Sequence, residues 1–287
     1  YIPVHNLHLV TRYTGASPEH APLHRLGSDQ WLKARKKAAK QARDVAAELL
    51  SLYAERAARK GIKSPINDDI YQRFTLEFPF QETNDQLNAI NDVLNDLDKG
   101  LPMDRLICGD VGFGKTEIAL RASFLAAMSG KQVSILAPTT LLARQHYETF
   151  KERFKGFPIN VFELSRLTPK KDSVIKSINS GSCDIVIGTH SLLGEKINFS
   201  DLGLLIIDEE QHFGVKHKEK IKKLRDNVHV LTLTAAPIPR TLQLAMTGVR
   251  DLSIIASPPI DRRAIETVSY THLRAHETDS YLVCRLL

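Results

Sequence analysis

Cysteines are few in this chain, and long apolar runs are absent. The 287 residues include Cys108, Cys183 and Cys284, whose spacing fits neither a disulfide framework nor a cysteine metal site. No apolar run approaches the length that spans a bilayer, and the N-terminus lacks the pattern of a signal peptide. We therefore expect a cytoplasmic protein in a reducing environment, with no membrane among its partners.

The net charge of +6 belongs to one segment, residues 28–63. This segment holds ten lysines and arginines against four acidic residues, so the rest of the chain is balanced. Two interpretations stay open: an electrostatic footprint for nucleic acid, or the solvated face of a long helix. The basic residues are Lys33, Arg35, Lys36, Lys37, Lys40, Arg43, Arg56, Arg59, Lys60 and Lys63.

The same segment has the pattern of one amphipathic helix. Ser28 is a suitable N-cap, and Gly61 and Pro65 end the segment. Between them, apolar residues recur at spacings of three and four and form a narrow stripe for contact with another surface. The stripe consists of Trp31, Ala34, Ala38, Ala42, Val45, Leu49 and Leu52. Before this helix, residues 1–13 alternate weakly and predict one or two short strands.

From about residue 68 onward, strand and helix patterns alternate. Strands are predicted at 104–108, 132–137, 159–164, 183–188, 202–208, 228–234 and 253–256. Helices are predicted at 84–98, 115–128, 140–153, 169–179, 217–225 and 239–246. Thr168 is expected to cap the helix that starts with Pro169. Continuous apolar strands such as 202–207 indicate burial on both faces, so the fold class is α/β with a mostly parallel sheet.

A glycine-rich motif lies between the first of these strands and the helix that follows it. It matches G-x-x-x-x-G-K-[ST], the phosphate-binding P-loop. Lys115 is expected to reach the β- and γ-phosphates and the Thr116 hydroxyl to hold Mg²⁺, while the helix N-terminus favours an anion. We therefore expect a nucleoside triphosphate with Mg²⁺ to bind at Gly109, Asp110, Val111, Gly112, Phe113, Gly114, Lys115 and Thr116.

A second motif begins where the apolar strand at 202–207 ends in carboxylates. Because ligands of such sheets bind beyond the carboxyl ends of the strands, Asp208 and Glu209 are expected to face the P-loop. We expect Asp208 to hold Mg²⁺ through water, and Glu209 to orient and deprotonate the attacking water. The predicted catalytic residues are thus Lys115, Thr116, Asp208 and Glu209.

Five segments, in this order along the chain, resemble motifs of superfamily 2 helicases and translocases. They are residues 78–86, 138–146, 188–190, 208–212 and 233–240. The resemblance implies a RecA-like lobe that binds ATP with Gln86 reading adenine, and with Phe78 either stacking on the base or belonging to the core. It implies DNA phosphate contacts from Thr139, Arg144 and Thr189, although Arg144 is alternatively a solvated helix residue. The residues expected to couple the nucleotide and DNA sites are His190, Gln211, His212, Thr234 and Arg240.

Within this superfamily, the RecG fork helicases and the transcription-repair coupling factor (Mfd) family share these motifs. Residues 110–117 and 208–219 resemble the second family more closely. So do residues 1–14 and 22–31, which resemble the end of its RNA-polymerase-interacting domain and the start of its linker helix. That resemblance implies an ATP-driven translocase on double-stranded DNA, which displaces RNA polymerase stalled at lesions and recruits nucleotide excision repair through UvrA. One alternative is a RecG-like DNA helicase, and another is a non-hydrolysing module that binds ATP or RNA polymerase.

The resemblance also implies how the chain is divided. Residues 1–27 are expected to end the polymerase-interacting β domain, 28–66 to form the basic linker helix, and 67–258 to form the RecA-like ATP-binding lobe. Residues 259–287 are expected to hold a truncated linker to a second lobe, followed by a tail from about residue 271 that fits neither family and reads as non-native.

Two departures from the family pattern bear on activity. The second lobe of this superfamily donates arginines to the γ-phosphate, so a chain without it is expected to bind ATP but to hydrolyse it weakly. Ala236 occupies a position where the family has threonine. We expect the missing hydroxyl to weaken coupling between hydrolysis and DNA movement while leaving ATP binding intact.

Overall fold

The computed structural model describes residues 68–213, 221, 228–236 and 250–259, together with isolated positions between 33 and 54. The chain divides into two compact units, residues 1–59 and 60–287. In the first unit, the described residues are helical and exposed, in agreement with the helix predicted there. They include Lys33, Arg35, Lys36, Lys37, Lys40 and Arg43.

Several predictions fall on parts of the chain outside the described residues. These are the strands predicted within 1–13, the helix at 239–246, most of the helix at 217–225, and the tail from 271. Arg240 lies outside them as well. Among the described residues, no helix is both long enough and apolar enough to cross a membrane.

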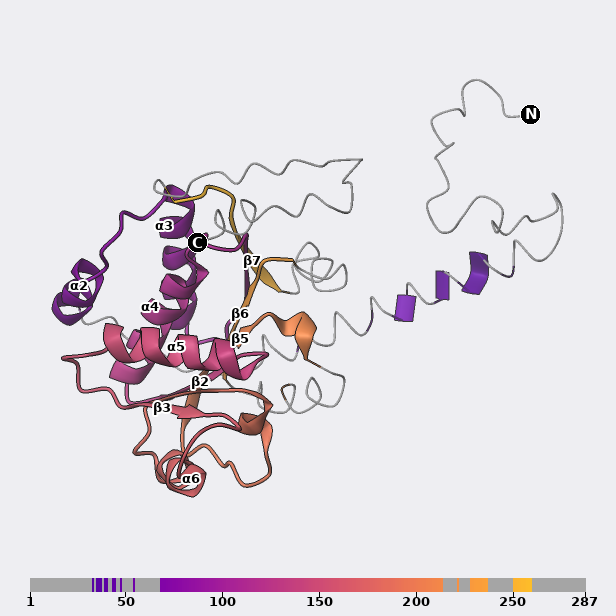
Figure 1. Cartoon of the computed structure of the whole chain (residues 1–287). Helices are drawn as coiled ribbons and strands as arrows, with labels where there is room; N and C mark the ends of the chain where they lie inside the picture. The colour runs from indigo at the N-terminus through magenta and orange to yellow at the C-terminus, as the bar shows by residue number, and fades with distance from the viewer. Residues whose placement is uncertain are drawn as a thin grey trace, which may run out of the picture. The chain divides into compact units, whose positions relative to one another are not determined.

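The second unit is built on a seven-stranded sheet with the order β3-β4-β2-β5-β6-β1-β7. The labels β7, β6, β5, β2 and β3 in Figure 1 follow this order from one edge of the sheet to the other. Every neighbouring pair of strands is parallel. Strands β2, β4 and β6 are buried along their whole length, as their apolar sequences predict. The strands are β1 (Asp104–Gly109), β2 (Gln132–Leu136), β3 (Val161–Leu164), β4 (Ile185–Gly188), β5 (Leu202–Asp208), β6 (His229–Thr234) and β7 (Asp251–Ile255).

Helices connect these strands and cover the sheet. Helix α3 (Asn84–Asp98) begins with a capping box, in which Thr83 and Gln86 exchange hydrogen bonds between side chain and backbone. Single-turn 3₁₀ helices, His190–Leu193 and Glu210–His212, follow β4 and β5. The described α-helices of this unit are α2 (Asp68–Leu76), α3 (Asn84–Asp98), α4 (Lys115–Met128), α5 (Thr140–Arg153) and α6 (Lys171–Ser180).

Separate apolar clusters cover the two faces of the sheet. One joins α3, α4 and α5 to strand residues such as Ile107, Ile135 and Ile206. The other joins α6 to residues of the opposite face, such as Leu136 and Ile207. Ile206 and Ile207 fall in different clusters because successive strand residues point to opposite faces. The predicted α/β fold with helices on both sides of a parallel sheet is confirmed.

The predicted strands, and the predicted helices that fall on described residues, match the observed bounds to within about two residues at each end. One predicted helix cap is wrong. Helix α6 begins at Lys171 after Lys170, whose φ of 58° is left-handed. Thr168 does not cap it, because its hydroxyl accepts a hydrogen bond from the Ser165 amide at 2.8 Å and closes a turn before the helix. Helix α2 had no counterpart among the predicted elements.

Candidate nucleotide-binding site

The P-loop joins β1 to α4 at the carboxyl edge of the sheet. Gly112 and Gly114 have φ values of 80° and 79°, which favour glycine over any residue with a Cβ. A Cβ on Gly114 would also collide with the Gln86 side chain. Helix α4 then begins at Lys115, so its first amides lie directly beside the loop. The glycines of the motif therefore have the structural role that a phosphate cradle requires.

Lys115 lies between the P-loop backbone and the carboxylates that end β5. Its Nζ donates to the carbonyl oxygens of Gly109 at 2.6 Å and Asp110 at 3.0 Å. Burial lowers the pKa of Lys115, while the negative charges of Glu209 and Asp208 oppose that shift. The P-loop and the motif that begins at Asp208 are almost a hundred residues apart in the sequence. Both interact with the same ammonium group, that of Lys115.

Glu209 is held in place by the end of strand β6. Its backbone has a left-handed φ of 52°, an unusual conformation for a residue with a side chain. The carboxylate accepts hydrogen bonds from the Ala235 amide at 3.0 Å and the Thr234 hydroxyl at 3.1 Å. The Gln211 side-chain amide also donates to it. The structure therefore brings two of the predicted coupling residues, Gln211 and Thr234, to the predicted catalytic glutamate.

Asp208 has a partner from outside its own motif, His146. The Nε2 atom of His146, on α5, lies 2.9 Å from Oδ2 of Asp208, and both side chains are largely buried. His146 belongs to the segment 138–146, which resembles a helicase motif and contains two residues that are predicted to contact DNA. Nothing in the local spacing indicated that this histidine reaches the second motif.

Gln86 connects helix α3 to the P-loop. It is buried, its Oε1 accepts from the Thr83 amide at 2.9 Å, and its Nε2 donates to the Phe113 carbonyl at 2.9 Å. Phe78 is half-buried, with the guanidinium groups of Arg121 and Arg153 each 5.9 Å from its ring centroid. Contact of Gln86 and Phe78 with adenine stays a prediction.

The predicted DNA-contacting residues follow the ends of β2 and β4, two neighbouring strands of the sheet. Thr139 caps α5 by accepting from the Leu142 amide at 3.2 Å. Arg144 is exposed, but it is paired with Glu148 at 2.8 Å and Glu163 at 3.0 Å. A phosphate contact by Arg144 would therefore compete with two carboxylates.

The third predicted DNA contact, Thr189, and two predicted coupling residues, His190 and His212, lie in the segments that follow β4 and β5. Thr189 is buried, with its hydroxyl 3.1 Å from that of Ser191, whereas His190 and His212 are exposed.

Among the described residues, no group of three or more histidine, cysteine, aspartate or glutamate side chains is arranged to hold a metal ion. The oxygen donors of Thr116 and Asp208 fit Mg²⁺ that is bound chiefly through nucleotide phosphates, because such Mg²⁺ needs few protein ligands.

A family model of DEAD/DEAH box helicases matches residues 83–245, which is more than half of the chain. The chain is 56% identical over 269 residues to the transcription-repair-coupling factor of Haemophilus influenzae, and 55% identical to that of Escherichia coli. These alignments cover 93% of this chain but 24% and 23% of those proteins. The chain thus spans about a quarter of the length of these two relatives.

Solved structures give a compatible result. RecG bound to a three-way DNA junction superposes with a TM-score of 0.63 at 34% identity, over 79% of this chain and 32% of that one. The RecA-like fold of the lobe and the resemblance to transcription-repair coupling factors, both predicted from the motifs, are confirmed by these comparisons.

Proposed function

This chain belongs to the DEAD/DEAH box helicase family, and we propose that its second unit is the ATP-binding lobe of a translocase on double-stranded DNA. The observation that carries the proposal is the convergence of the P-loop and the β5 carboxylates on Lys115. Phosphoryl-transfer enzymes need a phosphate cradle, a metal-holding carboxylate and a group that orients water at one place. The P-loop, Asp208 and Glu209 lie at the carboxyl edge of the sheet, which supports the proposal.

In the proposed reaction, each side chain has a task that follows from its position. Lys115 and the first amides of α4 would bind the phosphates of ATP, and Thr116 and Asp208 would hold Mg²⁺. The metal ion would neutralise charge on the phosphate oxygens when it is bound. Glu209 would orient a water molecule and accept its proton as the oxygen attacks the γ-phosphorus and ADP leaves.

For the whole protein, we propose the role of the transcription-repair coupling factors. The identity of 56% extends over 93% of the chain, so it covers most of the first unit, which the family model does not match. This supports RNA polymerase as a partner of the N-terminal part and double-stranded DNA as the track of the motor. Recruitment of UvrA would depend on regions that correspond to other parts of the relatives.

A test of the nucleotide site uses two variants of the 287-residue chain. Lys115→Ala should abolish binding of a fluorescent ATP analogue, whereas Glu209→Gln should retain binding. Glu209→Gln should instead reduce single-turnover hydrolysis by about 10²-fold or more, since positioning and proton transfer are lost together. Lys131→Ala, on a partly exposed lysine remote from the motifs, serves as the control. Unchanged nucleotide affinity in Lys115→Ala would refute the proposal.

A RecG-like helicase is a second candidate because of the structural similarity to RecG. The two candidates differ in the DNA that should stimulate hydrolysis. A coupling factor should respond to linear duplex DNA, and a RecG-like enzyme should respond more strongly to a three-way junction of the same length. Measuring ATP hydrolysis with each DNA at an equal concentration of DNA phosphate decides between the two candidates. The equal concentration matches the non-specific electrostatic binding.

A further inference from the structure

His146 links helix α5 to the carboxylate that is proposed to hold Mg²⁺. Its Nε2 lies 2.9 Å from Oδ2 of Asp208, and the side chains are 12% and 13% exposed. A carboxylate only accepts hydrogen bonds, so the Nε2 nitrogen carries the proton and donates it. Because little water reaches this pair, the hydrogen bond restrains the aspartate more strongly than a surface contact would.

The position of the imidazole is fixed by the packing of α5. Thr139 caps the first turn of this helix, and Ala143 and Phe150 are buried in the core between α5 and the sheet. The backbone of α5 therefore determines where the His146 ring stands. The donor reaches Asp208 from a rigid element and not from a loop.

Asp208 is also attracted electrostatically to the ammonium group of Lys115. Its negative charge is one of those that oppose the lowering of the Lys115 pKa. Without a donor on the other side, attraction to the ammonium group would favour rotation of the carboxylate toward Lys115. A carboxylate drawn into that ion pair would be poorly placed as a metal ligand.

We propose that His146 is a positioning residue that holds Asp208 in the orientation that binds Mg²⁺, and that it thereby ties the metal ligand to α5. This inference rests on the proposed nucleotide site. Hydrogen-bond partners of metal ligands typically change metal affinity by about 10–100-fold when they are removed. The segment 138–146 thus serves the nucleotide site through His146, in addition to the DNA contacts predicted for it.

The test separates loss of the donor from loss of the ring. His146→Leu removes the N–H group, whereas His146→Gln keeps one at the same number of bonds from the backbone. Glu152→Leu, at an exposed position of the same helix, controls for an added apolar side chain. The measurement is the dissociation constant of a fluorescent, non-hydrolysable ATP analogue, once with Mg²⁺ and once with EDTA. We expect His146→Leu to weaken binding about tenfold with Mg²⁺ and to leave it unchanged with EDTA.

His146→Gln should recover most of the affinity with Mg²⁺, and Glu152→Leu should match the unmodified chain under both conditions. Equal weakening with Mg²⁺ and with EDTA would overturn the inference, and so would a glutamine variant as weak as the leucine variant. Failure of the proposed function has a different signature. In that case the unmodified chain would show an affinity that Lys115→Ala does not change, or one that is the same with Mg²⁺ and with EDTA.

Discussion

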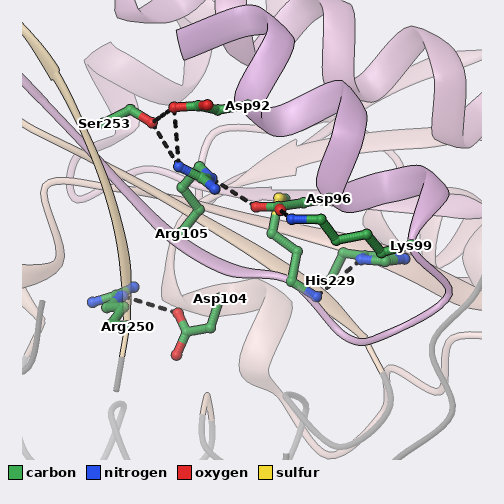
Figure 2. A network of polar contacts seen from close by, with 9 residues as sticks. Asp92, Asp96, Lys99, Asp104, Arg105, His229, Arg250 and Ser253 are labelled. Atoms are coloured by element: carbon green, nitrogen blue, oxygen red, sulfur yellow. Dashed lines mark hydrogen bonds and ion pairs between the residues drawn. The ribbon is translucent and has the colours of Figure 1, made fainter. Parts of the chain in front are cut away.

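Arg105, on β1, and Arg250, just before β7, are buried to a similar depth, yet they stabilise different parts of the molecule (Figure 2). Arg105 lies on the face covered by α3. It donates to Asp96 at 2.7 Å and Asp92 at 3.2 Å, both on α3, and to the Ser253 hydroxyl of β7 at 2.8 Å. Arg105 therefore fastens a helix to the edge of the sheet.

Arg250 immediately precedes β7 and uses its guanidinium group on the opposite face. It forms an ion pair with Asp104 at 2.9 Å, the contact drawn in Figure 2, and it donates to Glu210 at 3.1 Å. It also reaches the Thr232 hydroxyl of β6. Because Glu210 follows Glu209, Arg250 fixes a turn that belongs to the candidate site. A buried arginine that pairs with carboxylates thus stabilises helix packing at Arg105 and the geometry of the candidate site at Arg250.

The largest effect is expected for Arg250→Met. The substitution leaves Asp104 and Glu210, both mostly buried, without their shared cation, which should lower the free energy of unfolding by about 3 kcal/mol. Urea denaturation followed by circular dichroism measures this loss. Hydrolysis should fall in the folded fraction while ATP-analogue affinity is retained, because the turn that carries Glu209 loses an anchor. Unaltered turnover per folded molecule would show that Arg250 is only a structural residue.

Arg105→Met should have a smaller effect. Asp96 keeps a second cationic partner, Lys99, at 2.7 Å, so we expect a loss of about 2 kcal/mol in the free energy of unfolding. Nucleotide affinity and turnover per folded molecule should match the unmodified chain, since this network touches neither motif. If turnover fell as far as in Arg250→Met, the distinction between the two arginines would collapse.

The sequence predicted the sheet far better than it predicted either arginine network. Apolar runs such as residues 204–207 identify buried parallel strands from local pattern alone, and the P-loop is a contiguous motif. The partners of Arg105 are 9, 13 and 148 residues away, and two partners of Arg250 are 18 and 40 residues away. Such pairings depend on strand order and register, which no local pattern contains.

The same reasoning explains how far the candidate site was predictable. Glu209 was assigned from its place at a strand end, and that place follows from the fold class. His146 was overlooked because its partner is 62 residues away in the sequence. The wrong cap at Thr168 has a local cause, since a threonine hydroxyl serves a turn as readily as a helix. For Glu209, residue type and position predicted a role at the site, but only the tertiary structure identifies the partner of each of these side chains.

A third prediction concerns the pH dependence of the Arg105 network. Burial opposes ionisation of Asp96, but hydrogen bonds from Arg105 and Lys99 outweigh it and lower the pKa of Asp96 below its usual value. The resulting stabilisation is present above that value and is lost as the pH falls through the pKa of the folded state. The stability difference between Arg105→Met and the unmodified chain should therefore narrow from pH 7 to about pH 3. Urea denaturation at both pH values measures it, and a constant difference would contradict the assignment.

The smallest effect is expected for Asp92→Asn. Asp92 and Asp96 lie on the same helix and contact the same guanidinium group, but their side chains are 47% and 6% exposed. Water screens the exposed pair, and an asparagine oxygen still accepts hydrogen bonds from Arg105 and Ser253. Asp92→Asn should therefore cost less than about 1 kcal/mol in the free energy of unfolding, and Asp96→Asn distinctly more. Equal losses in urea denaturation would mean that burial does not decide the strength of these ion pairs.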